Sequence, residues 1–333
     1  MRRTALMVFL ATAICVPAIS ANAAVTYNPT VATMINGVTQ AELQPVVDEL
    51  SGVTPAVIGG SPYTILTRGS SSGTPIDKAE QYVYEKMLTY GLDSVAYQNY
   101  PGKGTVQPGR NVIGQINGTT NPSQIVVIGA HLDDQPWGEP RAPGADDNAS
   151  GVSATLYLAR SFADKTFERT IRFVFFGSEE NAPWTSNMFG SGYYAAQAVK
   201  AGENIVAMVS ADALAYNSSG KTPYIVEMHT RMKNPGLGLD LPIANMWKDV
   251  ITTYSIANLK PEIMSYSMKY SDHGAFWKYN SGKGATLLIE DEWSGENPNW
   301  HTPSDTVSTF NWSYYLSVTK SLVGLAAHQA GII

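Results

Sequence analysis

Apolar positions along the chain alternate between two spacings, which predict alternating strands and helices. An unbroken apolar run at 125–129 is typical of a strand buried on both faces of a sheet, and further strands are predicted at 171–176, 205–209 and 285–289. Helical spacing of apolar residues predicts helices over 153–162, 193–200, 243–254 and 312–328, with a further strand at 224–228. This order predicts an α/β fold of three layers, a mostly parallel (mixed) central sheet with helices on both faces.

The region before residue 111 shows a different pattern. Apolar residues have helical spacing over 39–50 and again over 77–90, and a strand is predicted at 63–67. A stretch rich in proline and glycine at 101–109 marks a junction. We therefore expect residues 24–110 to form an N-terminal segment of helices and a strand that packs on a main domain, residues 111–333.

The first 23 residues have the pattern of a signal peptide. Arg2 and Arg3 precede an apolar run at 5–19, and Ala21-Asn22-Ala23 is a small-x-small cleavage site. The run is too short to span a membrane, which needs about 20 apolar residues. We expect a secreted protein, extracellular or periplasmic, without membrane contact after cleavage.

Charge and cysteine content exclude some kinds of site. The chain has 22 basic and 28 acidic residues and no basic patch, so nucleic acid is not an expected partner. The one cysteine, Cys15, lies in the predicted leader. The mature chain would then have no disulfide and no thiolate ligand, so any zinc must be held by nitrogen and oxygen.

Imidazoles and carboxylates follow the predicted strands, where ligands bind in open α/β sheets. The set, completed by two residues from connecting loops, is His131, Asp133, Asp147, Glu179, Glu180, Asp212 and His301. Each pair alone is weak, because neighbouring acidic and histidine side chains are usually solvated. Their recurrence at equivalent topological positions favours a metal site.

Several of these residues lie in motifs that resemble those of the M28 family of zinc aminopeptidases. The motifs are Gly-Ala-His131-Leu-Asp133, Gly-Ala-Asp-Asp147-Asn-Ala-Ser-Gly, Glu179-Glu180, Asp212, Ser271-Asp272-His273 and His301-Thr-Pro-Ser-Asp305-Thr. The resemblance runs from about Arg68 to the C-terminal helix. It implies a zinc-exopeptidase fold, with residues 111–333 as the M28-like catalytic domain, and peptides as substrates.

The resemblance also implies how two zinc ions are held. The ligands are His131, Asp147, Glu180, Asp212 and His301. His131 and Asp212 hold one ion, Glu180 and His301 hold the other, and Asp147 bridges them. The bridge is placed at Asp147 rather than Asp146 because the family's ligand directly precedes Asn-Ala-Ser-Gly.

The remaining two residues take catalytic roles by the same resemblance. Glu179 is the general base and Asp133 supports the site from behind the ligands. Two metal ions about 3.5–4 Å apart can activate one water molecule and polarise the scissile carbonyl, while a neighbouring carboxylate shuttles the proton. The Asp133 carboxylate is expected to accept a hydrogen bond from the His131 ring. The predicted enzyme removes N-terminal residues from peptides.

Three other functions are compatible with the same scaffold. A carboxypeptidase would need a cation for the substrate carboxylate, and Arg141 is a candidate. A glutaminyl cyclase-like transferase uses a single zinc, which five ligand positions argue against. A binding protein without catalysis would typically lack ligands or the base, and none is missing here.

A few residues near these motifs receive a different interpretation. His273 is expected to help begin a helix at 271 or 272 rather than to bind metal, and His229 and His328 are expected to have no role. Trp300 is expected either to line a specificity pocket or to lie in the core. The connection 181–189 is longer than usual for the family and apolar, so it is expected to reshape the substrate cleft.

Overall fold

A computed structural model describes residues 24–102, 107–135, 138–181, 189–218, 222–266, 268–292 and 295–333. The predicted signal peptide, residues 1–23, lies outside this part of the chain. Most of the long connection at 181–189 lies outside it as well. Among the described helices, none has the length and apolar character needed to cross a membrane.

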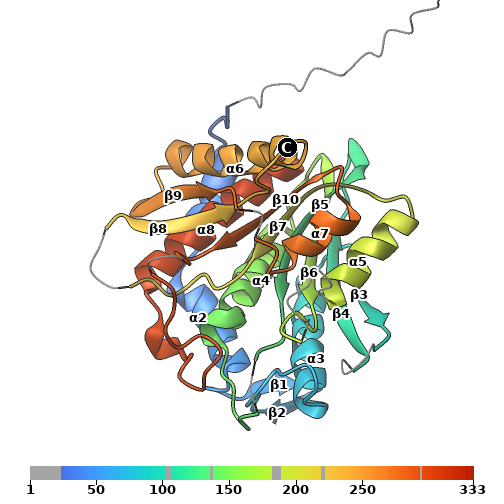
Figure 1. Ribbon diagram of the computed structural model, residues 1–333, viewed down its shortest axis with the longest axis vertical. Helices are drawn as coiled ribbons and strands as arrows, with labels where there is room; N and C mark the ends of the chain where they lie inside the picture. Colours follow the sequence, from blue (N-terminus) through green and yellow to red (C-terminus); the bar gives the residue numbers. More distant parts are fainter. Residues whose placement is uncertain are drawn as a thin grey trace, which may run out of the picture.

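One eight-stranded sheet forms the centre of the molecule (Figure 1), in the order β3-β4-β6-β5-β7-β10-β8-β9. Its strands are β3 (Ser94–Tyr100), β4 (Gly109–Ile116), β5 (Asn121–His131), β6 (Arg169–Phe176), β7 (Asn204–Ala211), β8 (Tyr224–His229), β9 (Leu259–Met264) and β10 (Gly284–Ile289). Strands β6, β5, β7 and β10 run parallel to one another, and β8 runs parallel to β9. Three neighbouring pairs are antiparallel, namely β3 with β4, β4 with β6, and β10 with β8. The prediction of a mixed, mostly parallel sheet is confirmed.

Helices cover both faces of this sheet (Figure 1). They are α1 (Pro29–Asn36), α2 (Gln40–Leu50), α3 (Thr74–Leu88), α4 (Gly151–Phe162), α5 (Phe189–Lys200), α6 (Gly236–Thr253), α7 (His273–Tyr279) and α8 (Trp312–Ala330). Alternate residues of β5 face opposite layers, because side chains alternate along a strand. Val126 and Ile128 join the core beneath α4 and α8, whereas Ile125 and Val127 join the core beneath α5 and α7. The three-layer prediction is confirmed.

The N-terminal segment is built into the same structure. Helices α1 and α2 pack against α8 and α4, and β3 pairs along its whole length with β4 as an edge strand. The segment also contains a small hairpin of β1 (Ala56–Ile58) and β2 (Ser61–Tyr63). The segment therefore shares the core of the main domain.

The strand predicted at 63–67 is wrong over most of its length, since β2 ends at Tyr63. The backbone beyond it forms hydrogen bonds with loops instead. The Leu66 carbonyl accepts from the Ala142 N–H, and the Arg68 N–H donates to the Asp134 carboxylate. The helix predicted at 243–254 begins earlier, at Gly236, and contains Pro242. Apolar spacing alone detects neither a loop with tertiary partners nor a helix that continues through a proline.

Candidate metal centre

The carboxyl ends of three adjacent parallel strands carry the core of the predicted site. His131 is the last residue of β5, Asp212 directly follows β7, and Glu179 and Glu180 follow β6. Because β6, β5 and β7 are neighbours in the sheet, these ends meet at one edge. This is where open α/β sheets bind ligands.

Asp147 reaches the same place from the turn η1 (Ala145–Ser150), just before α4. Gly144 begins this turn with a φ of 47°, in the left-handed region that favours glycine. Gly151 closes it where a Cβ would lie 2.3 Å from the Ala211 carbonyl oxygen. The Asp305 carboxylate accepts the backbone N–H groups of Asp146 and Asp147 at 3.1 and 3.0 Å. Glycine at both ends and the Asp305 carboxylate therefore position the Asp147 side chain.

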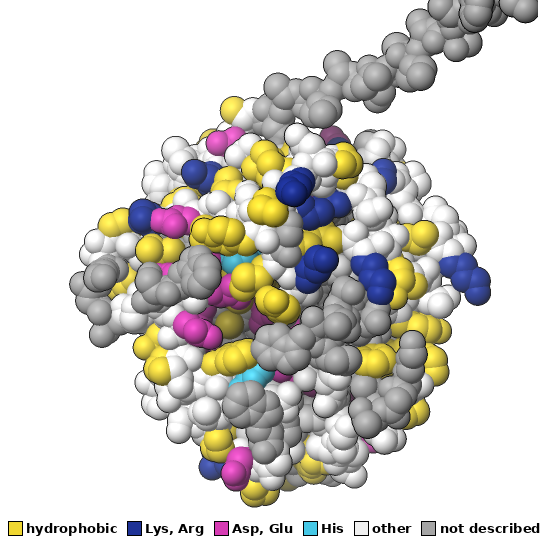
Figure 2. All heavy atoms as spheres, viewed as in Figure 1, with side chains coloured by type: hydrophobic (Ala, Val, Ile, Leu, Met, Phe, Trp, Pro, Cys, Tyr) yellow, Lys and Arg dark blue, Asp and Glu magenta, His cyan; other side chains and the backbone are white. Residues whose placement is uncertain are grey.

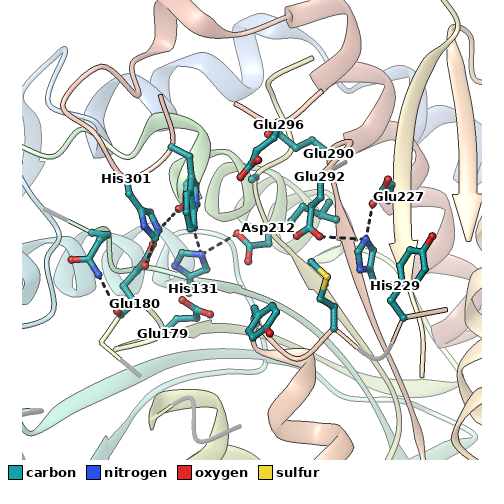
Figure 3. A pocket seen from close by; sticks show the side chains of 18 residues that line it. His131, Glu179, Glu180, Asp212, Glu227, His229, Glu290, Glu292, Glu296 and His301 are labelled. Atoms are coloured by element: carbon teal, nitrogen blue, oxygen red, sulfur yellow. Dashed lines mark hydrogen bonds and ion pairs between the residues drawn. The ribbon is translucent and has the colours of Figure 1, made fainter. Parts of the chain in front are cut away.

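The ligand atoms form two clusters that share Asp147, and Figure 3 labels the other four ligands. His131 Nε2 lies 3.0 Å from Asp212 Oδ1 and 3.1 Å from Asp147 Oδ1. His301 Nε2 lies 3.0 Å from Glu180 Oε2 and 3.2 Å from Asp147 Oδ2. Each oxygen of Asp147 thus faces a different histidine, which is the arrangement of a carboxylate bridging two ions. The structure brings together all five predicted ligands.

Charge within the centre is unbalanced toward carboxylates. Burial acts to lower the pKa of His131, but the carboxylates of Asp212 and Asp147 outweigh it and hold that pKa well above its usual range. Burial raises the pKa of Glu180 well above normal, and the nearby Asp147 adds to the effect. Burial would also raise the pKa of Asp147, but hydrogen bonds from His131 and His301 lower it overall. Buried carboxylates packed this closely favour divalent cations among them.

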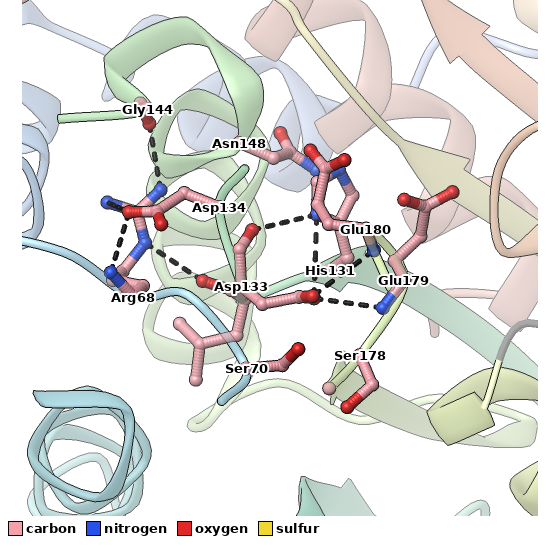
Figure 4. A network of polar contacts seen from close by, with 12 residues as sticks. Arg68, Ser70, His131, Asp133, Asp134, Gly144, Asn148, Ser178, Glu179 and Glu180 are labelled. Carbon is pink, nitrogen blue, oxygen red and sulfur yellow. Dashed lines mark hydrogen bonds and ion pairs between the residues drawn. The ribbon is translucent and has the colours of Figure 1, made fainter. Parts of the chain in front are cut away.

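Asp133 supports the centre differently from the prediction (Figure 4). The His131 Nδ1 donates to the main-chain carbonyl of Asp133 at 3.0 Å, while the Asp133 carboxylate is 3.9 Å away. That carboxylate instead accepts the backbone N–H groups of Glu179 and Glu180, at 3.0 and 3.1 Å. Burial raises the pKa of Asp133 to about 6. Asp133 therefore fixes the His131 ring through its backbone and the Glu179-Glu180 segment through its side chain.

Arg68 is a supporting residue that the sequence interpretation missed (Figure 4). Its guanidinium is fully buried and donates to the carbonyls of Leu132, Gly144 and two other residues at 2.8 Å. It thereby ties the loop after β5 to the loop that carries Asp147. A lone arginine without a local pattern gives no signal in the sequence. Asp305, by contrast, lies in a motif noted above, to which no role was assigned.

Three of the five described non-glycine residues with a positive φ are ligands or lie within two residues of one. His301 has a φ of 57°, Ser178 before Glu179 has 57°, and Ala213 after Asp212 has 45°. Residues with side chains seldom adopt this left-handed region, and such positions cluster at functional sites. The strain supports the assignment of this edge of the sheet as the functional site.

A family model decides which proteins this chain is related to. The model of peptidase family M28 matches residues 111–326, which is most of the described sheet and all predicted ligands. The chain belongs to peptidase family M28. The resemblance inferred from the motifs is thereby confirmed.

Similar proteins agree with this assignment. The chain is 25% identical to the protein YfbL of Escherichia coli over 280 residues, covering 79% of this chain and 83% of YfbL. It is 30% identical to a probable leucine aminopeptidase of Arthroderma otae over 215 residues, covering 62% of this chain but only 54% of the relative. The aminopeptidase LapA of Legionella pneumophila shares the fold, with a TM-score of 0.71, 21% identity and coverage of 91% and 75%. The chain thus spans about half the length of the fungal relative.

A cavity of about 480 Å³ opens from the M28 centre. Figure 2 shows carboxylates and imidazoles gathered in a hollow on this face, bordered by apolar side chains. Trp300 lines the cavity, and its ring stacks on the His301 ring with centroids 3.5 Å apart. Of the two alternatives for Trp300, the structure therefore supports the pocket.

Three residues considered from the sequence have clear positions in the M28 chain. His273 begins α7, is buried, and its Nε2 donates to the Met268 carbonyl at 2.7 Å, so it is not a ligand. Arg141 is exposed and does not line the cavity. His229, which was expected to have no role, is buried and lines the cavity beside Glu227.

Proposed function

We propose that this M28 chain is an aminopeptidase that uses two zinc ions to remove N-terminal residues from peptides. The observation that carries the proposal is the pair of ligand clusters sharing Asp147 at the mouth of one cavity. The printed names of the fungal relative and of LapA, an aminopeptidase in each case, support the reaction.

The donor set fits zinc rather than a harder cation. Each cluster offers an imidazole nitrogen and carboxylate oxygens, the ligands of catalytic zinc sites, which keep a position open for substrate. His131, Asp212 and Asp147 would hold one ion, and His301, Glu180 and Asp147 the other. When bound, the pair of ions supplies Lewis-acid activation of water and of the scissile carbonyl.

Glu179 supplies the proton chemistry in this proposal. Its side chain is buried and lines the cavity next to both clusters. Burial raises the pKa of Glu179 well above its usual range, with His131 opposing the effect. The carboxylate accepts a proton from the attacking water and delivers it to the leaving amine. Asp133 holds the Glu179 backbone in place for this step.

The alternative of a carboxypeptidase receives no support from the residue that suggested it. Arg141 is exposed and lies outside the cavity lining. Among the described residues that line the cavity, none is lysine or arginine, and several are carboxylates. A substrate carboxylate would meet like charges there, whereas a free α-ammonium group meets opposite charges.

Assays with blocked dipeptides test the reaction directly. We expect the zinc-loaded protein to cleave carboxyl-blocked dipeptides and aminoacyl chromogenic substrates, and to leave amino-blocked dipeptides intact. A chelator should abolish the activity, and zinc should restore it. Cleavage of amino-blocked dipeptides alone would make the enzyme a carboxypeptidase.

We also propose that the protein is exported, with residues 1–23 removed. The motive is the charged start, apolar run and Ala-x-Ala site described above. Mass spectrometry of the exported protein should give an N-terminus at Ala24. An exported chain that retains Met1 would contradict this proposal.

A further inference from the structure

The cavity that opens from the metal centre has a second, acidic end. We define the acidic end as the side chains of Glu227, Glu290, Glu292 and Glu296, all of which line the cavity. In Figure 3 Glu227, Glu290 and Glu292 lie beyond Asp212, on the side away from His131 and His301, and Glu296 lies above Asp212. The same cavity therefore joins the cleavage chemistry to a group of carboxylates.

The fold places these carboxylates together by strand geometry. Glu227 and His229 are two apart on β8 and so point to the same face. Strand β8 pairs with β10, where Ile289 lies opposite Glu227, and Glu290 follows directly. Of the group, Glu227 and Glu290 are buried, Glu292 is partly buried and Glu296 is exposed. The acidic end thus extends from the cavity floor toward its rim.

The His229 ring lies beside two of the four carboxylates. His229 Nε2 lies 2.7 Å from Glu227 Oε2, and the nearest oxygen of Glu292 is 3.8 Å away. The 2.7 Å separation is that of a hydrogen bond. His229 therefore balances Glu227 and leaves the other carboxylates of the acidic end in excess.

Buried polar atoms at this end lack hydrogen-bond partners within the described part of the chain. These atoms are His229 Nδ1, Glu290 Oε2 and Glu292 Oε2. His229 and Glu290 are 2% and 3% exposed, so water compensates them little. Burial raises the pKa of Glu292 to about 7, with Glu227 and Asp212 adding to the effect against His229. Unsatisfied buried acceptors beside an open cavity indicate a ligand that brings hydrogen-bond donors.

Apolar side chains also line the cavity. They are Ala213 and Ile289, which form a small buried cluster with Leu287, and Met268. A ligand that fits must be apolar along its stem and cationic at its tip. Arginine and lysine side chains have this composition. A leucine-like side chain would displace water from the carboxylates without donating a hydrogen bond to them, which is unfavourable.

We propose that the cavity accepts the side chain of an N-terminal arginine or lysine, with its cationic head among the carboxylates of the acidic end. This specificity rests on the proposed aminopeptidase function and names its substrate class. The alkyl stem packs on Ala213, Ile289 and Met268, and Glu292 is the principal partner of the guanidinium or ammonium group. Arginine can present two parallel N–H donors to a carboxylate.

Pairs of substrates that differ in charge alone test the proposal. The zinc-loaded full chain is assayed with arginyl and citrullinyl coumarylamides, and with lysyl and norleucyl coumarylamides. We expect kcat/KM to be about 10- to 100-fold higher for the charged member, as one charge-assisted hydrogen bond provides. Glu292→Gln should remove most of this ratio while leaving the citrullinyl and norleucyl rates within twofold of wild type.

Two further variants separate specificity from folding. Glu227→Gln should also lower the ratio, and Asp164→Asn, which changes an exposed carboxylate that does not line the cavity, should leave every rate unchanged. Circular dichroism and melting temperature establish that each variant is folded. Equal loss on all substrates in Glu292→Gln would assign Glu292 to the α-ammonium group and overturn the proposal.

Calorimetric measurement of ligand binding tests the cationic side-chain site independently of the proposed cleavage reaction. Wild-type protein should bind L-argininamide more tightly than L-citrullinamide, and Glu292→Gln should not distinguish them. Cleavage that favours leucyl substrates, without a charge preference, would overturn the specificity and leave the aminopeptidase intact. Absence of any cleavage together with Glu292-dependent binding of argininamide would overturn the reaction and leave the cationic site intact.

Discussion

Glu179→Gln is expected to lower kcat by about 10²- to 10⁴-fold, the usual contribution of general acid–base catalysis, while two zinc ions remain bound per chain. The amide keeps the size of the carboxylate but cannot accept a proton. Among the described residues, none forms a hydrogen bond or ion pair with the Glu179 carboxylate, whereas both oxygens of Glu180 lie within 3.1 Å of His301 Nε2. Rates and metal content measured on one preparation test the prediction.

Glu180→Gln is the matched control for this experiment. It changes the neighbouring carboxylate by the same single atom, yet it removes a proposed ligand. We expect it to lose part of its zinc and to melt at a lower temperature, because metal binding is coupled to the folded state. If the Glu179 variant loses zinc and the Glu180 variant keeps both ions, the two roles are exchanged. If both variants stay active, the catalytic site lies elsewhere.

Asp147→Asn is expected to lower the zinc content from two ions to one or fewer and to lower kcat/KM by at least ~100-fold, since the two-ion clamp is lost. Each oxygen of Asp147 faces a different histidine, at 3.1 and 3.2 Å. An amide offers one oxygen, and its nitrogen is no ligand. The protein should also melt at a lower temperature in the presence of zinc. Metal analysis, kinetics and thermal unfolding measure the three effects.

Asp146→Asn provides the comparison that decides which aspartate bridges. Asp146 is buried beside Asp147, but its oxygens accept from the Ala215 N–H at 2.7 Å and from Asn297 Nδ2 at 3.1 Å. This variant should keep both zinc ions but unfold more easily. The new amide N–H₂ group would face the Ala215 N–H or Asn297 Nδ2, so one buried hydrogen bond is replaced by a contact between two donors. Loss of zinc from the Asp146 variant, with zinc retained in the Asp147 variant, would reverse the assignment.

Much of the site was predictable because strand ends of a parallel sheet converge. Apolar runs identified β5, β6 and β7, and the polar residues after each run had to meet at one edge of the sheet. That reasoning, with the motifs, selected all five residues that the structure brings together. Edge strands such as β3 were missed, because half-exposed residues carry a weak periodic signal.

Atom-level contacts were not predictable from residue order. Asp133 lies beside His131 in the sequence motif, but local spacing could not tell whether its carboxylate or its carbonyl would meet His131. The answer depends on where the loop after β6 places the backbone N–H groups of Glu179 and Glu180. Arg68 is separated from its partners by up to 76 positions along the chain, so no motif contains it.

The sequence by itself determined the layered fold, because hydrophobic period constrains strands and helices locally, and its motifs, by their resemblance to the M28 family, implied the five ligand candidates. Only the tertiary structure decided which side chains form the acidic end of the cavity. His229 had no role in the sequence interpretation, yet pairing of β8 with β10 brings it and Glu227 next to Glu290. Register between strands distant along the chain sets which side chains share a wall, and that register depends on the packing of the whole sheet.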